Sequence, residues 1–141
     1  MRDRPARGSL ILVLDENLSG HRIVKGLTEC GIPVKPQTDL MKRGIPDEEV
    51  LSALADHPDC FLLSKDSDFH KKPMIRKALI RHGIGAFVIT SHKGKTAPEL
   101  VQLINSAWRR MQRFAEQHER PFVAKILADG HVEEVRYQSE T

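Results

Sequence analysis

The sequence predicts a single-domain α/β protein with a mainly parallel central sheet. Short, wholly apolar runs, typical of strands buried on both faces, alternate with amphipathic segments of helical period. This alternation predicts parallel strands joined by right-handed crossovers. Near the C-terminus, Asp129-Gly130 separates two apolar segments, which predicts a closing β-hairpin with a two-residue turn. A length of 141 residues suits one domain with its own core.

Six strands are expected, at residues 10–14, 32–35, 60–64, 86–90, 122–127 and 132–137. Pro33 and Pro36 make the second strand weak or peripheral, because proline cannot donate a ladder hydrogen bond. No repeat, linker or low-complexity stretch interrupts the chain. The domain is therefore expected to cover residues 1–141, with flexible ends at 1–9 and 138–141.

Helices are expected between these strands. One begins near Ser19 and ends at Gly31, and another begins at Pro46-Asp47 with Asp47 as its N-cap. A third runs from Pro73 to Gly83. In the fourth, which is long and amphipathic, Thr96 and Glu99 form a capping box. Its apolar stripe predicts core packing and consists of Leu100, Leu103, Ile104, Ala107, Trp108, Met111, Phe114 and Ala115.

Composition indicates an ordinary globular protein without a membrane segment. The chain is 40% hydrophobic and 29% charged, and no apolar run approaches the length of a membrane-spanning helix. Cys30 and Cys60 are expected to be buried, reduced thiols, which points to the cytoplasm. The seven histidines show no metal-ligand spacing and are expected at the surface or at caps. Neither a G-x-S-x-G elbow nor a glycine-rich phosphate loop is present.

Positive charge is gathered in two segments, although the net charge is only +3. The residues are Lys71, Lys72, Arg76, Lys77 and Arg81, and then Arg109, Arg110 and Arg113. These segments could steer a polyanion, or could be ordinary solvated helix faces.

Acidic residues follow two of the predicted strands. Asp15 ends the first strand, and Asp66 and Asp68 follow the third. In open α/β sheets, functional groups collect beyond the carboxyl ends of strands, near the point where the strand order reverses. If the two strands are neighbours, these carboxylates approach one another.

The second helix adds further carboxylates. Asp47 and Glu48 precede Val50 and Leu51 by three residues, which puts them on the sheet-facing side, whereas Glu49 shares a side with Ser52. The candidate catalytic residues are Asp15, Asp47, Glu48, Asp66 and Asp68. Each also has a structural explanation, as a helix cap or a turn former.

Converging carboxylates would raise one another's pKa unless a cation compensates. Mg²⁺ or Mn²⁺ prefers such an all-oxygen shell and could activate water for attack on a phosphodiester. Asp15 and Asp66 are the expected principal ligands, with Asp68 and Glu48 as further ligands. Asp47 or Glu48 would orient the attacking water.

The succession LVLDENL, PDEEVL and FLLSKDSDF resembles a compact branch of the PIN-like superfamily, related to the VapC-type toxin nucleases. The later AFVITS strand, the long helix and the closing PFVAKILADGHVEEV segment are similar too, so the resemblance spans about residues 10 to 136. It implies a three-layer fold and a Mg²⁺- or Mn²⁺-dependent ribonuclease, with a small antitoxin protein as partner. It also implies metal-binding roles for Asp15 and Asp66, assisted by Asp47, Glu48 or Glu49.

Other interpretations remain open. A catalytically inactive PIN-like module would bind RNA or protein without cutting. A receiver-like phosphoacceptor domain would use Asp15, Asp66 and Thr90, and a Toprim-like metal site would use Glu16. Homodimerisation through the long helix or the hairpin edge is also expected to be feasible.

Overall fold

The computed structural model describes residues 10–18, 20–66, 68–91 and 93–135. The ends expected to be flexible, 1–9 and 138–141, lie outside this range. Its strands are β1 (Ile11–Leu14), β2 (Val34–Pro36), β3 (Cys60–Ser64), β4 (Gly85–Ile89), β5 (Phe122–Ile126) and β6 (Val132–Glu134). Its helices are α1 (His21–Glu29), η1 (Gln37–Asp39), α2 (Asp47–Leu54), η2 (Phe69–Lys71), α3 (Pro73–His82) and α4 (Ala97–Gln117).

The strands form one sheet in the order β2-β1-β3-β4-β5-β6. Neighbouring strands from β2 to β5 are parallel, and β6 pairs antiparallel with β5. The predicted mixed sheet is therefore confirmed, with the proline-containing second strand at one edge. After β1 the chain first adds β2 on one side and then β3 on the other, so the strand order reverses at β1.

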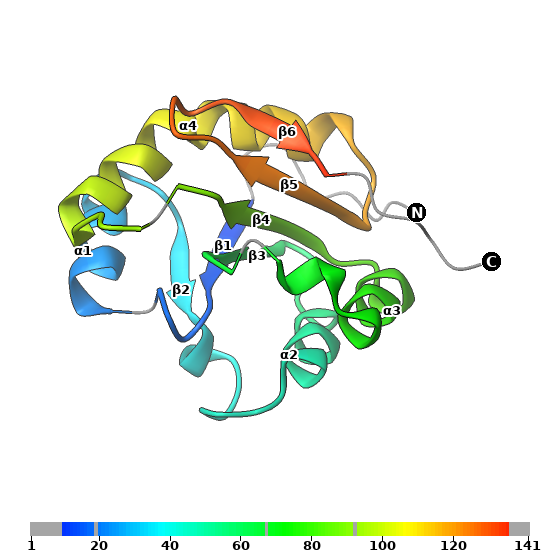
Figure 1. Ribbon diagram of the computed structural model, residues 1–141. Helices are drawn as coiled ribbons and strands as arrows, with labels where there is room; N and C mark the ends of the chain where they lie inside the picture. Colours follow the sequence, from blue (N-terminus) through cyan, green and yellow to red (C-terminus); the bar gives the residue numbers. More distant parts are fainter. Residues whose placement is uncertain (1–9, 19, 67, 92, 136–141) are drawn as a thin grey trace.

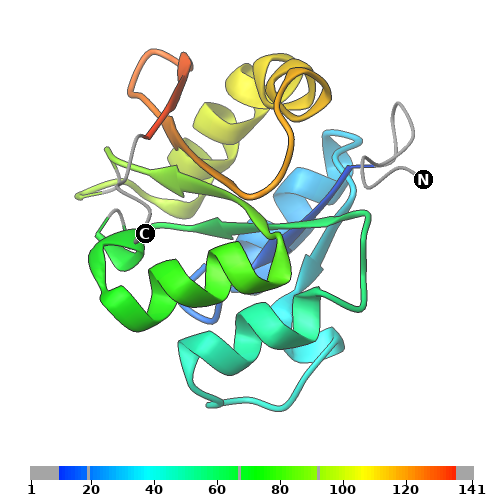
Figure 2. The same ribbon diagram turned by 90° about the vertical axis from the view of Figure 1, so that its right-hand side faces the viewer.

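Helices cover both faces of the sheet and give three layers (Figure 1). Helices α1 and α4 pack on one face, and α2 and α3 lie side by side on the other (Figure 2). Within the described residues, no helix is both long and apolar enough to cross a membrane.

Alternation along β1 assigns each residue to a face. Leu12 and Leu14 enter the core beneath α1 and α4, whereas Val13 enters the core beneath α2 and α3. Since successive strand side chains point to opposite faces, Asp15 shares the face of Val13. On β3, Ser64 shares the face of Leu62 by the same rule.

The long helix α4 is built as predicted. Thr96 and Glu99 form the capping box, and Pro98 lies in the first turn, where its missing N–H costs nothing. The predicted apolar stripe is buried, except that Trp108 is only partly buried. The apolar face of α4 is thus used within the monomer.

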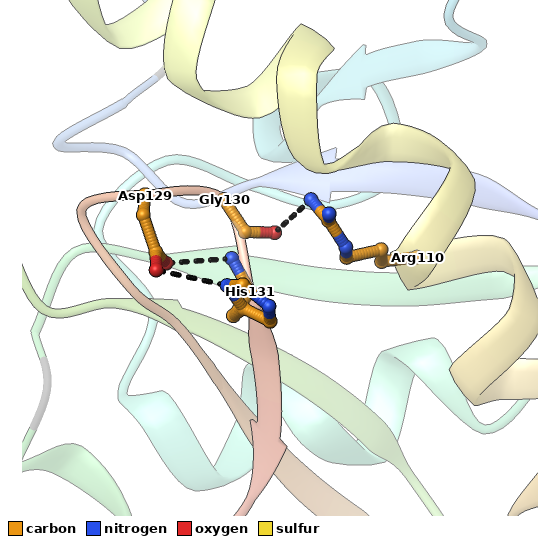
Figure 3. A network of polar contacts seen from close by, with 4 residues as sticks. All are labelled: Arg110, Asp129, Gly130 and His131. Atoms are coloured by element: carbon orange, nitrogen blue, oxygen red, sulfur yellow. Dashed lines mark hydrogen bonds and ion pairs between the residues drawn. The ribbon is translucent and has the colours of Figure 1, made fainter.

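The hairpin is confirmed, but its connection is longer than two residues. The Leu127 N–H donates to the His131 carbonyl at 2.9 Å, so the turn lies within residues 127–131. Asp129 accepts the His131 backbone N–H at 3.0 Å and contacts its Nδ1 at 2.9 Å, while Arg110 Nη1 donates to the Gly130 carbonyl at 3.3 Å (Figure 3). Gly130 has φ 89°, which favours glycine there. Arg110 therefore has a structural role between α4 and the turn.

Three local predictions were wrong. Cys30 is exposed, because α1 ends at Glu29 and Cys30 is its C-cap, whereas Cys60 is buried as expected. The N-cap of α2 is Pro46, so Asp47 is the first helical residue and not the cap. His70 is buried, and this burial lowers its imidazole pKa.

Candidate functional site

A small polar pocket lies beyond the carboxyl ends of β1 and β3, on the face covered by α2. Its volume is about 80 Å³, which admits several water molecules. The polar residues lining it are Asp15, Asn17, Gln37, Asp47, Ser64 and Asp66. Val50, Leu51 and Leu62 supply the apolar part of its wall.

Strand register explains why three of these residues meet. Pro36, Leu14 and Leu63 are paired across β2, β1 and β3. The residues that directly follow these three in the chain are Gln37, Asp15 and Ser64, of which Gln37 begins η1 and Asp15 comes just after β1. Because the strands are parallel, these residues lie at one edge of the sheet, at the reversal of strand order.

Asp15 is partly buried, and its carboxylate is held by several hydrogen bonds. The Asn17 and Leu18 backbone N–H groups each donate to Oδ1 at 3.1 Å, and the Ser64 hydroxyl donates to the same side chain. Burial nevertheless raises the pKa of the Asp15 carboxyl, and the negative charge of Asp47 adds to the rise. The folded protein thus holds Asp15 where its ionised form is less stable than it would be in water.

Ser64 connects the two strand-end acids. Its side chain is buried, and its Oγ accepts the Asp66 backbone N–H at 3.0 Å while its hydroxyl donates to Asp15. Asp66 Oδ1 in turn accepts the Asp68 N–H at 3.1 Å, which shapes the turn after β3. The exposed carboxylate of Asp66 also has Lys72 Nζ at 4.0 Å.

The first turn of α2 closes the pocket. Asp47 lines it together with Val50 and Leu51, which follow by three and four residues and therefore share its side of the helix. Asp47 is exposed to solvent and lines the pocket at the start of α2.

Glu48 and Asp68, the other two candidate acids, lie elsewhere. Glu48 lines a separate groove between α2 and α3, with Glu49 and Ser52. Glu48, which was expected on the same side of the helix as Asp47, is half-buried and lines this groove instead of the polar pocket. Asp68 is exposed and its Oδ1 lies 3.0 Å from Lys71 Nζ. The structure brings together Asp15, Asp47 and Asp66 only.

Asn17, Gln37 and Ser64 were not among the predicted site residues. Ser64 carried a signal, since it is the polar end of an apolar strand and lies two residues after Leu62 on the same face. Asn17 lies in the LVLDENL segment. Gln37 gave no signal, because its position depends on the register of the edge strand β2.

The donor set fits a hard divalent cation with retained water. Among the described residues, no three His, Cys, Asp or Glu side chains are grouped so that they could hold a metal ion. Mg²⁺, however, commonly uses one or two protein carboxylates and keeps several waters. The pocket offers carboxylate, amide and hydroxyl oxygens, together with a partly buried carboxyl of raised pKa that a cation would stabilise.

The Toprim-like and receiver-like interpretations each need a residue that does not line the pocket. Glu16, needed for a Toprim-like site, accepts the Gly44 backbone N–H at 2.5 Å and fastens the loop after η1 to the loop after β1. Thr90, needed for a receiver-like site, donates from Oγ1 to the Ile126 carbonyl at 3.2 Å and does not line the pocket.

The two basic segments lie on opposite layers. Arg109, Arg110 and Arg113 belong to α4, on the far side of the sheet from the pocket. The other five, at and after η2, form what we call the α3 basic group: Lys71, Lys72, Arg76, Lys77 and Arg81. Only this group is on the layer that carries the pocket, and Lys72 reaches toward Asp66.

Comparison with known proteins agrees with this arrangement. The family described as "PIN like domain" matches residues 11–91, more than half of the 141 residues. The match runs from β1 through β4 and includes every residue that lines the pocket. No curated protein and no solved structure matches the chain significantly. From the extent of the family match, the chain belongs to the PIN-like domain family.

Proposed function

We propose that this protein is a Mg²⁺- or Mn²⁺-dependent nuclease that cuts RNA at the polar pocket. The observation that carries the proposal is that three acidic residues from separate parts of the chain, after β1, in the turn after β3 and in α2, line one small pocket. The raised pKa of Asp15 adds to it, because a bound cation would relieve the cost of that buried charge.

Each residue has a distinct part in this proposal. Asp15 and Asp66 would hold the cation, and Ser64 would keep both in position through its two hydrogen bonds. Asp47, at the opposite wall, would orient the attacking water and accept its proton. When bound, the cation supplies a more acidic water and offsets charge that develops on the phosphodiester.

RNA is the proposed substrate because of the charge beside the pocket. The α3 basic group lies on the same layer as the pocket, and the Nζ of its Lys72 is 4.0 Å from the carboxylate of Asp66. Positive side chains on this layer would attract the phosphates of RNA, with an affinity that falls as salt rises. The resemblance to ribonucleases favours RNA over DNA.

Asp66→Asn is expected to lower the rate of RNA cleavage by at least about 10- to 100-fold, the range for losing an outer partner of a metal ligand, because Asp66 would bind the cation directly. Asp68→Asn is the matched control, since Asp68 lies two residues away but pairs with Lys71 at the surface. The measurement is cleavage of a 5′-labelled single-stranded RNA with Mn²⁺, with Mg²⁺ and with EDTA. The control variant should cleave at close to the wild-type rate.

Equal activity of wild type and Asp66→Asn, or activity that survives EDTA, would contradict the proposal. A wild-type protein that binds Mn²⁺ and RNA but leaves the RNA intact would instead support a binding module without catalysis. The cation affinity and the RNA affinity of each variant therefore need to be measured alongside cleavage.

A toxin role, with a small antitoxin protein as partner, is a finer part of the proposal and is supported by the VapC-like order of motifs. Expression of the wild-type chain in a bacterial host is then expected to arrest growth, whereas Asp15→Asn expressed at the same level is not. Growth curves with immunoblots measure this. Equal arrest by both proteins would contradict the toxin role.

As a homodimer interface, the edge strands β2 and β6 are favoured over the apolar face of α4, because that face is buried within the protein.

A further inference from the structure

Gln37 is a buried polar residue at the pocket that the proposed mechanism does not yet use. It is only 4% exposed and lines the pocket beside Asp15. Within the described part of the chain, only its backbone carbonyl, which accepts from Leu40 and Met41, takes part in hydrogen bonds, and its side-chain amide has no partner. The amide atoms are not among the buried side-chain atoms without a partner, so the amide keeps contact with solvent, and the pocket is the solvent-filled space that Gln37 lines.

The Gln37 amide has no hydrogen-bond partner among the described protein groups, yet it is not sealed away from water. A ligand in the pocket could therefore supply the partner that the amide lacks. Gln37 is kept in place by β2, whose register puts it at the same sheet edge as Asp15 and Ser64.

The charge balance of the pocket explains why a neutral oxygen is useful there. Three acidic residues, Asp15, Asp47 and Asp66, already line this small pocket. A fourth carboxylate would add repulsion in the cation-free protein. An amide oxygen adds a ligand of the kind that hard cations accept without adding charge.

We propose that Gln37 is a further residue of the cation site, contributing its amide oxygen to the oxygen shell of a bound divalent cation. This inference rests on the proposed metal-dependent function and adds a residue to it. Gln37 thus tunes the affinity for the cation by providing an uncharged oxygen ligand beside Asp15.

Mn²⁺ affinity tests this directly, without cleavage. The full chain is titrated with Mn²⁺, and free Mn²⁺ is measured by electron paramagnetic resonance for wild type, Gln37→Leu and Gln37→Glu. We expect Gln37→Leu to weaken binding by about 10-fold or more, and Gln37→Glu to tighten it. Gln102→Leu is the matched control, because Gln102 is exposed on α4 on the other face of the sheet, and its affinity should equal that of wild type.

Thermal unfolding without Mn²⁺ separates this role from a structural one. If Gln37 acts on the cation, Gln37→Leu should melt close to the wild-type temperature, because the side-chain amide has no protein hydrogen bond to lose. Gln37→Glu should melt lower, since it adds a carboxylate beside Asp15. Wild-type affinity in both Gln37 variants would overturn the inference and leave the proposed function standing. A wild-type protein that fails to bind millimolar Mn²⁺ would overturn both.

Discussion

Phe87→Ala is expected to lower the free energy of unfolding by about 3–5 kcal/mol, the usual range for truncating a buried phenylalanine. Phe87 lies in the middle of β4 and is fully buried at 0% exposure. Its ring centroid lies 5.5 Å from that of Phe122, 6.2 Å from that of Phe61 and 6.3 Å from that of Phe114. The substitution removes the centre of this aromatic cluster and leaves a cavity between the sheet and α4. Urea unfolding followed by circular dichroism measures the loss.

Met74→Ala is the control for that experiment. Met74 lies on α3 with 62% exposure, so its truncation should change the free energy of unfolding by at most about 0.5 kcal/mol. A Phe87→Ala loss as small as the control's would mean that the α4 face of the sheet is not packed as described. Because domains of this size have only about 5–15 kcal/mol of stability, the expected loss could unfold a large share of the molecules at 37 °C.

Strand positions were predictable because each inner strand is a short apolar run that ends in polar residues. β3 has the predicted bounds, Cys60–Ser64, and β1 begins one residue later than expected. Local signals also predicted the capping box of α4 and the glycine that ends α3, where Gly83 has φ 64°. These features depend on neighbouring residues in the chain, and for that reason the sequence reveals them.

Features that depend on contacts between distant elements were less predictable. Glu48 and Asp47 are adjacent, and helical spacing alone allowed both to face the sheet. In the structure, Asp47 lines the polar pocket, whereas Glu48 lines the groove between α2 and α3, which exists only because these two helices pack together. Cys30 was expected inside because it follows Leu27 at a helical interval, but the helix ends one residue before it.

Some residues of the candidate site could likewise be predicted from the sequence, and others could not. The adjacency of Asp15 and Asp66 follows from parallel strands that end at one edge, and it could be predicted once β1 and β3 were assumed to be neighbours. Gln37 could not be predicted, because its place beside Asp15 requires the register of an edge strand of only three residues. The Glu16–Gly44 hydrogen bond, which fastens the loop following η1, was equally beyond local rules.

Asp15→Asn is expected to make the cation-free protein more stable at neutral pH. Burial raises the pKa of the Asp15 carboxyl in the folded protein above its usual value. The folded protein therefore binds a proton at this carboxyl more readily than the unfolded chain does. Stability therefore falls as the pH rises from about 3.8 through the raised pKa, and the penalty is fully present above it. Asparagine keeps an oxygen for the Asn17 and Leu18 N–H groups and carries no charge. Its advantage in melting temperature should shrink as the pH falls toward 4.

The same substitution is expected to reduce RNA cleavage by about 100- to 1000-fold, because it removes the charge around which the proposed site is built. Saturating Mn²⁺ should raise the melting temperature of the wild type, since a ligand that binds only the folded state stabilises it, and should raise that of Asp15→Asn much less. The cation would thus reduce or reverse the difference in melting temperature between wild type and Asp15→Asn. If Asp15 had only a structural role, Mn²⁺ would not change the difference in melting temperature between the two proteins. If Asp15 binds the cation, that difference must change. Melting curves of both proteins, with and without Mn²⁺ at pH 7, decide between them, and parallel shifts would contradict the metal site.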